Sequence, residues 1–321
     1  MLLTGPMLTF DDIASALRTV RDVVHHTPLL SSSQANARAG NTVFFKAENL
    51  QRIGAFKIRG AYNKIATLSA EERRRGIIAH SSGNHAQGAA LAARILGVRA
   101  VVVMPENSPA IKVAATRGYG AEVVFCANSL DDRERVARAY EEREGLVPVH
   151  PFNDEKIMAG QGTAVLEMAE ELPAPDYLVV PVGGGGLISG CAVAARHLWP
   201  SVRVIGVETE PANDAQRSFR SGAIVRIAPP DTIADGMRTQ ALGTKTFEVI
   251  RAFVDDIVTV TDAQVVETMR FLLERMKIVA EPTGAVAPAA VLANVLGCSG
   301  RTVCAVISGG NVDPAFLRSI L

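Results

Sequence analysis

Short apolar runs rich in β-branched residues alternate with segments of helical period along most of the chain. One series runs from "GIIAHSS" through "VRAVVVMP" and "AEVVFC" to "VPVHPF". A second begins at "DYLVVPVGGGG" and continues through "SVRVIGVE" and "DIVTV" to "RTVCAVISGGN". Because buried strands alternating with helices are typical of parallel sheets covered on both faces, the pattern predicts an α/β protein.

The two series predict two domains, each a twisted, mostly parallel sheet flanked by helices. The strand "NTVFFKAENL" is expected to join the second series, so residues 1–75 and 153–321 would form a large domain. Residues 76–152 would then form a small, mobile domain inserted into it. A length of 321 residues suffices for both cores.

Composition and charge narrow the classes of partner. Lys plus Arg and Asp plus Glu both count 33, so no net field attracts nucleic acid or an anionic membrane, and a small-molecule partner is expected. The N-terminus lacks the features of a secretory signal and no apolar run is long enough to span a membrane, which favours a cytoplasmic location. The four cysteines form no C-x-x-C pair, so neither zinc nor a disulfide framework is expected.

The stretch "VPVGGGGLISG" joins an expected buried strand to an expected helix. Its four consecutive glycines are Gly183, Gly184, Gly185 and Gly186. Backbone N–H groups and the positive end of the helix dipole can bind a phosphate there. Gly184-x-Gly186-x-x-Ser189, with Glu208 ending the next strand, also approaches a dinucleotide fingerprint, which leaves an NAD-dependent oxidoreductase as an alternative.

The stretch "GAFKIRGAYNKI" places Lys57 between Phe56 and Ile58, with glycines three residues before and after it. A lysine in apolar surroundings has a lowered pKa and can form a Schiff base with an aldehyde. Beside a phosphate site, such a lysine indicates pyridoxal phosphate. A surface lysine is the plain alternative, because other basic residues lie close by in the sequence.

Six motifs together resemble those of the fold-type II pyridoxal-phosphate enzymes, which share a tryptophan-synthase-β-like fold. These motifs are "FKIRGAYNKI", "SSGNHAQGAA", "GGGGLISG", "ADGMRTQALG", "MKIVAEPTGA" and "SGGNVD". The similar branch contains serine racemase, serine and threonine dehydratases and 3-hydroxyaspartate dehydratase. The resemblance extends from about residue 8 to the C-terminus.

The resemblance implies roles for residues around the cofactor. Lys57 would hold pyridoxal phosphate and act as the base that removes the α-proton. Phe56 would pack on the pyridine ring, the four glycines would bind the phosphate, and Asn84 would bind the 3′-hydroxyl. Ser308 would face the pyridine nitrogen, where a neutral hydroxyl favours β-elimination over transamination.

Substrate-binding residues are expected in two of these motifs. In "SSGNHAQ", Ser81, Asn84 and His85 begin an expected helix and could receive the substrate carboxylate. Ser82 matches the serine that opposes the lysine in the racemases of the branch, although it could simply cap the helix. Gly236 in "ADGMRTQALG" is expected to border the substrate.

A divalent-metal site is expected in "GVETEPANDAQ". Glu208, the Ala212 carbonyl and Asp214 are oxygen ligands of the kind that Mg²⁺, Ca²⁺ or Mn²⁺ takes. The same positions bind a divalent ion in the resembling branch. Alternatively, Asp214 caps a helix and Glu208 ends a strand.

The expected reaction is elimination of water from a β-hydroxy amino acid, giving a keto acid and ammonia. The candidate substrates are 3-hydroxyaspartate, L-serine and L-threonine, and racemisation is the alternative main activity. A second substrate carboxylate would need a cation such as Arg133, Arg135 or Arg238, although the first two could equally lie on a solvated helix face. The resemblance also implies a homodimer and is compatible with activation by ATP.

Overall fold

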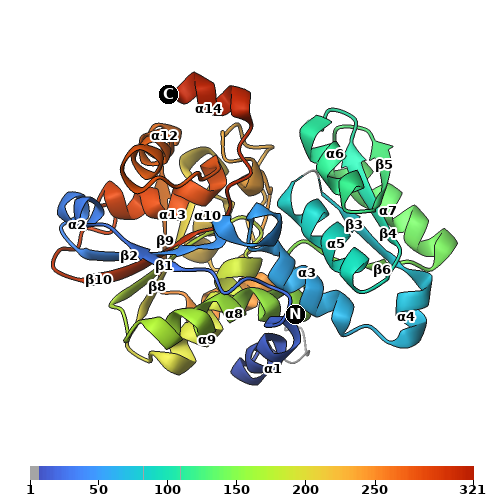
Figure 1. Cartoon of the computed structure of the whole chain (residues 1–321), viewed down its shortest axis with the longest axis horizontal. Helices are drawn as coiled ribbons and strands as arrows, with labels where there is room; N and C mark the ends of the chain where they lie inside the picture. The colour runs from blue at the N-terminus through green and yellow to red at the C-terminus, as the bar shows by residue number, and fades with distance from the viewer. Residues whose placement is uncertain (1–6, 82, 109) are drawn as a thin grey trace.

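The computed structural model describes residues 7–81, 83–108 and 110–321, and these form two sheets (Figure 1). The larger sheet has the order β1 (Leu29–Ser31), β2 (Thr42–Ala47), β10 (Thr302–Ile307), β7 (Tyr177–Pro181), β8 (Arg203–Thr209) and β9 (Asp256–Val260). Only β1 runs antiparallel to its neighbour. The smaller sheet is parallel throughout, in the order β5 (Glu122–Cys126), β4 (Ala100–Pro105), β3 (Ile77–His80) and β6 (Val147–Pro148).

Helices cover both faces of each sheet (Figure 1). One face of the larger sheet packs against α1 (Phe10–Val20), α8 (Glu155–Glu171), α9 (Gly186–Leu198), α10 (Asp214–Ser221) and α11 (Thr244–Phe253). The other packs against α2 (Ser33–Ala39), α12 (Asp262–Phe271), α13 (Pro282–Leu292) and α14 (Pro314–Ile320). The smaller sheet lies between α7 (Leu130–Glu144) and the group α3 (Lys57–Ala66), α5 (Asn84–Ile95) and α6 (Ala110–Gly118), with α4 (Ala70–Arg75) beyond α3. No helix in these described stretches is long and apolar enough to cross a membrane.

Successive strand residues are buried on opposite faces, as the two-residue period of a strand requires. In β7, Leu178 and Val180 join the core under α8 and α9, whereas Val179 joins the core under α13. In β4, Val101 and Val102 likewise face the two different cores of the smaller sheet. This double burial explains why the strands are continuous apolar runs in the sequence, and the α/β architecture predicted from those runs is confirmed.

Helix α3, which carries Lys57, is held close against α8. A Cβ atom on Gly160 would lie 2.6 Å from the Arg59 carbonyl oxygen, and one on Gly60 would lie 2.7 Å from the Ile157 carbonyl oxygen. Only glycine allows backbones to approach this closely. The paired glycines therefore set where the first turn of α3 lies. The domain boundaries and the mobility of the smaller unit stay predictions.

Candidate active site

A cavity of about 1130 Å³ lies between the two sheets. The cavity wall includes one residue from the carboxyl end of each of four strands. These strands are β3, β4, β7 and β10, and the residues are, in the same order, His80, Pro105, Pro181 and Ser308. An ion pair between Lys112 of α6 and Asp235 of the 3₁₀ turn η4 (Asp235–Met237) links the two units beside it. Ligands of open α/β sheets bind at this edge, so the cavity is the candidate site.

Lys57 is the first residue of α3, and its side chain lines the cavity. Its Nζ donates to the Pro151 carbonyl oxygen at 2.9 Å and lies 5.1 Å from the centroid of the Phe56 ring. Burial lowers the pKa of Lys57 to about 8, because the charged amine loses hydration. The amine can therefore be neutral near physiological pH, as a nucleophile or base requires.

The tetraglycine forms a tight turn between β7 and α9 at the cavity wall. Gly185 has φ +93°, and a Cβ atom on Gly184 would lie 2.3 Å from the Phe152 ring. The turn therefore has no room for side chains, and its backbone is open to the cavity. Backbone N–H groups at a helix N-terminus bind phosphate, so this turn fits the phosphate of pyridoxal phosphate.

Asn84 is fixed from both ends of its amide. Its Nδ2 donates to Glu281 Oε1 at 2.6 Å, and its Oδ1 accepts from Asn311 Nδ2 at 2.8 Å. Burial and the negative charge of Asp235 raise the pKa of Glu281 to about 8. The second N–H of the Asn84 amide is left for a ligand acceptor, as binding of a ring hydroxyl would require.

Ser308 and Gly236 lie on the same part of the cavity wall as Thr283. The Ser308 hydroxyl, which is buried, donates to the Thr283 carbonyl oxygen at 3.4 Å. The Gly236 N–H donates to Thr283 Oγ1 at 3.0 Å. The Ser308 hydrogen bond is long, so this hydroxyl can turn toward a ring nitrogen, whereas the Gly236 N–H already has a partner.

Ser81 and His85 border the cavity at the start of α5, whereas Ser82 falls outside the described residues. Ser81 Oγ accepts from the Gly83 N–H at 3.2 Å. His85 Nε2 lies 2.8 Å from the Val149 carbonyl oxygen, so Nε2 is the donor, and burial keeps the pKa of this ring well below 6.5. His85 Nδ1 then carries a lone pair, so a carboxylate would be received by the amides of α5 and not by this ring.

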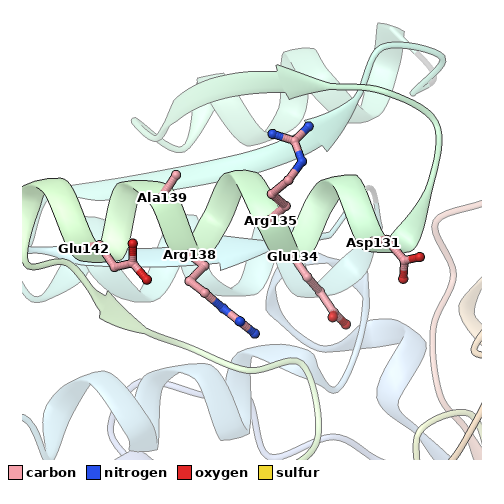
Figure 2. A pocket seen from close by; sticks show the side chains of 6 residues that line it. All are labelled: Asp131, Glu134, Arg135, Arg138, Ala139 and Glu142. Atoms are coloured by element: carbon pink, nitrogen blue, oxygen red, sulfur yellow. The ribbon is translucent and has the colours of Figure 1, made fainter.

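Arg133 and Arg135 lie in different environments in the structure. Arg133 lines the cavity, and its Nε is buried without a partner among the described residues. Arg135 has a side chain that is 71% exposed and pairs with Asp132 at 2.7 Å, in a shallow depression of about 340 Å³ along α7 (Figure 2). Of these two arginines, Arg133 is the one placed to meet a ligand in the cavity. Arg238 also lines it, but its guanidinium donates to the Thr232 carbonyl.

Glu208, Ala212 and Asp214 lie together, away from the cavity, where β8 leads into α10. Glu208 accepts from the Ala215 and Gln216 N–H groups at 3.0 and 2.8 Å. Both carboxylate oxygens of Asp214 are buried without a partner in the part of the chain that the structure describes. Burial raises the pKa of Asp214 to about 7, and burial together with Asp214 raises that of Glu208. Two adjacent buried acids fit a bound cation.

Glu281 and Pro151 are among the residues of the site that were not predicted. Glu281 lies in "AEPTGA", but nothing in that motif indicates a contact with a residue 197 positions earlier. Pro151 acts through its backbone carbonyl, which every residue possesses. The first was detectable as an unexplained acid within an apolar motif, whereas the second has no signal in the sequence.

The chain is similar to known proteins over nearly all of its length. Residues 20–309 match the family model described as pyridoxal-phosphate dependent enzyme. An L-threo-3-hydroxyaspartate ammonia-lyase of Saccharomyces cerevisiae is 49% identical and a serine racemase of Schizosaccharomyces pombe 48% identical, each over 95% of this chain and 94% of the relative. The solved structure of maize serine racemase superposes with a TM-score of 0.95 at 39% identity, covering 98% of this chain and 97% of that one.

These matches favour pyridoxal phosphate over a dinucleotide at the glycine turn. The geometry agrees, because Glu208, the acid that a dinucleotide ribose would need, does not line the cavity beside the tetraglycine. Its carboxylate faces Asp214 and the first turn of α10 instead. The alternative of an NAD-dependent oxidoreductase is therefore wrong.

Proposed function

Since the chain belongs to the pyridoxal-phosphate-dependent enzymes, we propose that it removes water from a β-hydroxy amino acid and yields a keto acid and ammonia. The observation that carries this proposal is the Lys57 amine, which lines the cavity with a lowered pKa. Its partner is a carbonyl and not a carboxylate. An amine without a counter-ion can lose its proton and then take the α-proton of a substrate.

The residues of the cavity fit the cofactor. Lys57 would hold its aldehyde carbon, the tetraglycine amides its phosphate, the Asn84 amide its ring oxygen and the Ser308 hydroxyl its ring nitrogen. Phe56 would pack against the ring. When bound, the cofactor supplies an electron sink for the pair left behind when the α-proton is removed. Lys57 would then be the group that carries this proton at Nζ.

We infer that the preferred substrate has a second carboxylate, as 3-hydroxyaspartate does. Arg133 supports this inference, because it lines the cavity with a buried Nε that has no partner among the described residues, and burial lowers its pKa. Holding the buried Nε–H of a guanidinium without an acceptor is unfavourable, and a carboxylate can accept from Nε and a terminal nitrogen with two parallel hydrogen bonds. The 49% identical hydroxyaspartate ammonia-lyase agrees with this choice.

The test compares kcat/KM for the stereoisomers of 3-hydroxyaspartate with those for L-serine and L-threonine. We expect at least one hydroxyaspartate isomer to be preferred by about tenfold or more, which is about 1.4 kcal/mol of transition-state binding. A tenfold preference for either monocarboxylate would contradict the role of Arg133.

Serine racemisation is the second candidate. It is supported by the 48% identical serine racemase and by Ser82 in the "SSGNH" motif. If Ser82 returns a proton to the face opposite Lys57, Ser82→Ala should suppress L-to-D conversion much more than elimination. Equal loss of both activities, with cofactor still bound, would contradict that role.

We further propose that Glu208, Asp214 and the Ala212 carbonyl hold Mg²⁺, Ca²⁺ or Mn²⁺. The unpartnered oxygens of Asp214 support this site. The described residues contain no group of three or more Asp, Glu, His or Cys ligands, so carbonyls and water would complete the shell.

A homodimer is proposed as the assembled form. Leu50 and Val279 are exposed apolar side chains on neighbouring segments, since Asn49 Nδ2 donates to the Val279 carbonyl oxygen at 3.0 Å. Adjacent exposed apolar side chains favour a protein contact. Activation by ATP and a cytoplasmic location stay predictions.

A further inference from the structure

The turn of residues 150–153 joins the smaller sheet to α8 and meets three parts of the cavity wall. Pro151 lies against Lys57, and the ring of Phe152 packs on the tetraglycine. Asn153 Oδ1 accepts from the Lys245 N–H at 2.9 Å. A movement of this turn would therefore reach Lys57 and the phosphate-binding turn together.

His150 fixes the shape of the turn through one ring atom. Its Nδ1 accepts from the N–H groups of Phe152 and Asn153 at 3.1 and 2.8 Å. Since Nδ1 accepts two hydrogen bonds, the remaining proton of the neutral ring is on Nε2. Burial and the neighbouring His80 and Lys57 lower the pKa of His150 to about 4, so this arrangement persists at neutral pH. The ring cannot pass a proton between its nitrogens while Nδ1 is engaged.

We propose that the Pro151 carbonyl receives the Lys57 amine whenever that amine is not bonded to the cofactor, and that His150 is the positioning residue that holds this carbonyl in place. The inference rests on the proposed function of Lys57. Its geometric basis is the 2.9 Å hydrogen bond from Nζ to the Pro151 oxygen. The turn around that oxygen has its two N–H groups tied to His150 Nδ1.

The carbonyl would act on both protonation states of the amine. As a neutral amine, Lys57 donates one N–H to the oxygen, which limits the directions in which its lone pair can point. When the α-C–H bond breaks, its electron pair stays on the substrate side and the proton bonds to Nζ. The resulting ammonium keeps its hydrogen bond to the same oxygen. A hydrogen bond to the charged form favours that form, so the carbonyl raises the pKa of an amine that burial lowers.

The test compares His150→Asn with His150→Leu. The Asn side-chain oxygen can occupy the position of Nδ1, whereas Leu has a similar volume and no acceptor. In the holoenzyme, we expect the Leu variant to lose about tenfold or more in kcat with KM within about twofold, because Lys57 is displaced only after substrate has bound. The Asn variant should stay within about threefold of wild type in both.

The pKa of Lys57 provides a readout that does not depend on turnover. It is obtained from the pH dependence of the chemical modification rate of Lys57 in the full-length, cofactor-free chain. The Leu variant should show a value below wild type by about half a pH unit or more, and the Asn variant should not. Burial and the charge of Lys57, which lies near both, lower the pKa of His85 and of His150, and both rings are neutral in this pH range.

Three results would overturn the proposal. The first is a Leu variant with unchanged kcat and unchanged Lys57 pKa, and the second is a Leu variant whose Lys57 pKa rises toward 10.5 because water has entered. The third is an Asn variant that loses as much kcat and Lys57 pKa as the Leu variant. If the Leu variant does not fold, His150→Gln replaces it, because its acceptor lies one bond farther out. His197→Asn is the matched control, since it removes a ring stacked on Phe10, with centroids 3.7 Å apart, outside the cavity.

The outcome is separable from that of the proposed function. Borohydride should fix the cofactor to Lys57 in wild type and in every His150 variant. Attachment elsewhere in wild type would refute the role of Lys57 in the reaction, whereas the modification experiment would still show whether its amine rests at Pro151.

Discussion

Lys46 and Lys57 occupy nearly the same local sequence, each following a phenylalanine in an apolar stretch, yet the fold treats them oppositely. The Lys46 side chain is 0% exposed, and its Nζ donates to Glu167 and to the Thr27 carbonyl oxygen, both at 2.6 Å. Among the described residues, Lys57 donates to the Pro151 carbonyl and to no carboxylate, and it faces a cavity. A buried lysine paired with a carboxylate, such as Lys46, has a structural role. A buried lysine without such a partner, such as Lys57, can lose its proton and act as a nucleophile or base.

Lys46 belongs to a buried cluster in which the positive and negative charges are equal in number. Arg59, two residues after Lys57, makes bidentate contacts with both Glu48 and Glu167, at 2.6 to 2.8 Å. Two cations and two anions therefore balance, and Glu48 also accepts from the Thr27 hydroxyl at 2.5 Å. Breaking such a cluster is costly because the remaining charge stays buried. Lys57, in contrast, forms no ion pair with any acid in the part of the chain that the structure describes.

The largest effect is expected from removing the uncompensated lysine. Lys57→Ala should reduce turnover by about 10⁴-fold or more, since the covalent anchor and the base are lost together. Release of keto acid measures turnover, and visible absorbance of the bound cofactor measures attachment. A Lys57→Ala protein that stays yellow through a borohydride-reducible bond to another lysine would contradict the assignment.

Removing the compensated lysine should damage folding. Lys46→Met is expected to lower the free energy of unfolding by about 3–5 kcal/mol, because Glu167 loses one of its two cations inside the protein. Urea denaturation of the cofactor-free chain measures the change. The control is Lys64→Met, which breaks the 2.7 Å pair with Asp154 near the surface and should cost about 1 kcal/mol or less. Equal losses in the two variants would show that the buried cluster has no special role.

The comparison extends to the acids, because Glu208 and Asp214 are neighbouring buried acids for which we propose a divalent cation. Mg²⁺ at 100 times its dissociation constant should raise the free energy of unfolding by about 2.7 kcal/mol, and a chelator should remove this gain. Asp214→Asn should abolish the response to Mg²⁺. An equal response in that variant would place the ion elsewhere.

Arg133 and Arg135 offer the same contrast among the arginines. Arg133→Leu should lower kcat/KM for 3-hydroxyaspartate by about 10- to 100-fold while changing that for L-serine by less than about threefold. Arg135→Leu, which removes a guanidinium paired on an exposed face, should change either value by less than about twofold. A similar loss for both substrates in Arg133→Leu would indicate binding of the α-carboxylate instead.

Strand periodicity predicted the two sheets, and the resemblance to the fold-type II enzymes implied that Lys57, the tetraglycine and Ser308 gather around one cofactor. The sequence could not separate Arg133 from Arg135. Residues two apart point to opposite sides of a helix, but α7 is charged around most of its surface, so the pattern does not say which side is inward. The Asn84 to Glu281 contact depends on packing between distant segments, and the Pro151 carbonyl depends on backbone geometry. The acid at position 281 stands out in its motif but its partner does not, and the Pro151 carbonyl has no local signal.

The smallest effect expected is a gain in stability from Lys57→Met in the cofactor-free chain. The pKa of Lys57 is about 8 when folded and 10.5 when unfolded, so folding below pH 8 must either bury the charge or release the proton. Removing the amine should therefore raise the free energy of unfolding by about 1–2 kcal/mol at pH 7. This value is smaller than the full pKa shift would give, because solvent in the open side of the cavity screens the charge. The wild-type penalty is complete below about pH 8, declines between about 8 and 10.5 as the unfolded chain also loses its proton, and is absent above that range. Urea denaturation at pH 7 and pH 10 should show a clearly smaller gain at the higher pH, because pH 10 lies close to the unfolded pKa of 10.5. A Lys57→Met protein less stable than wild type at pH 7, as Lys46→Met is expected to be, would mean that both lysines are structural.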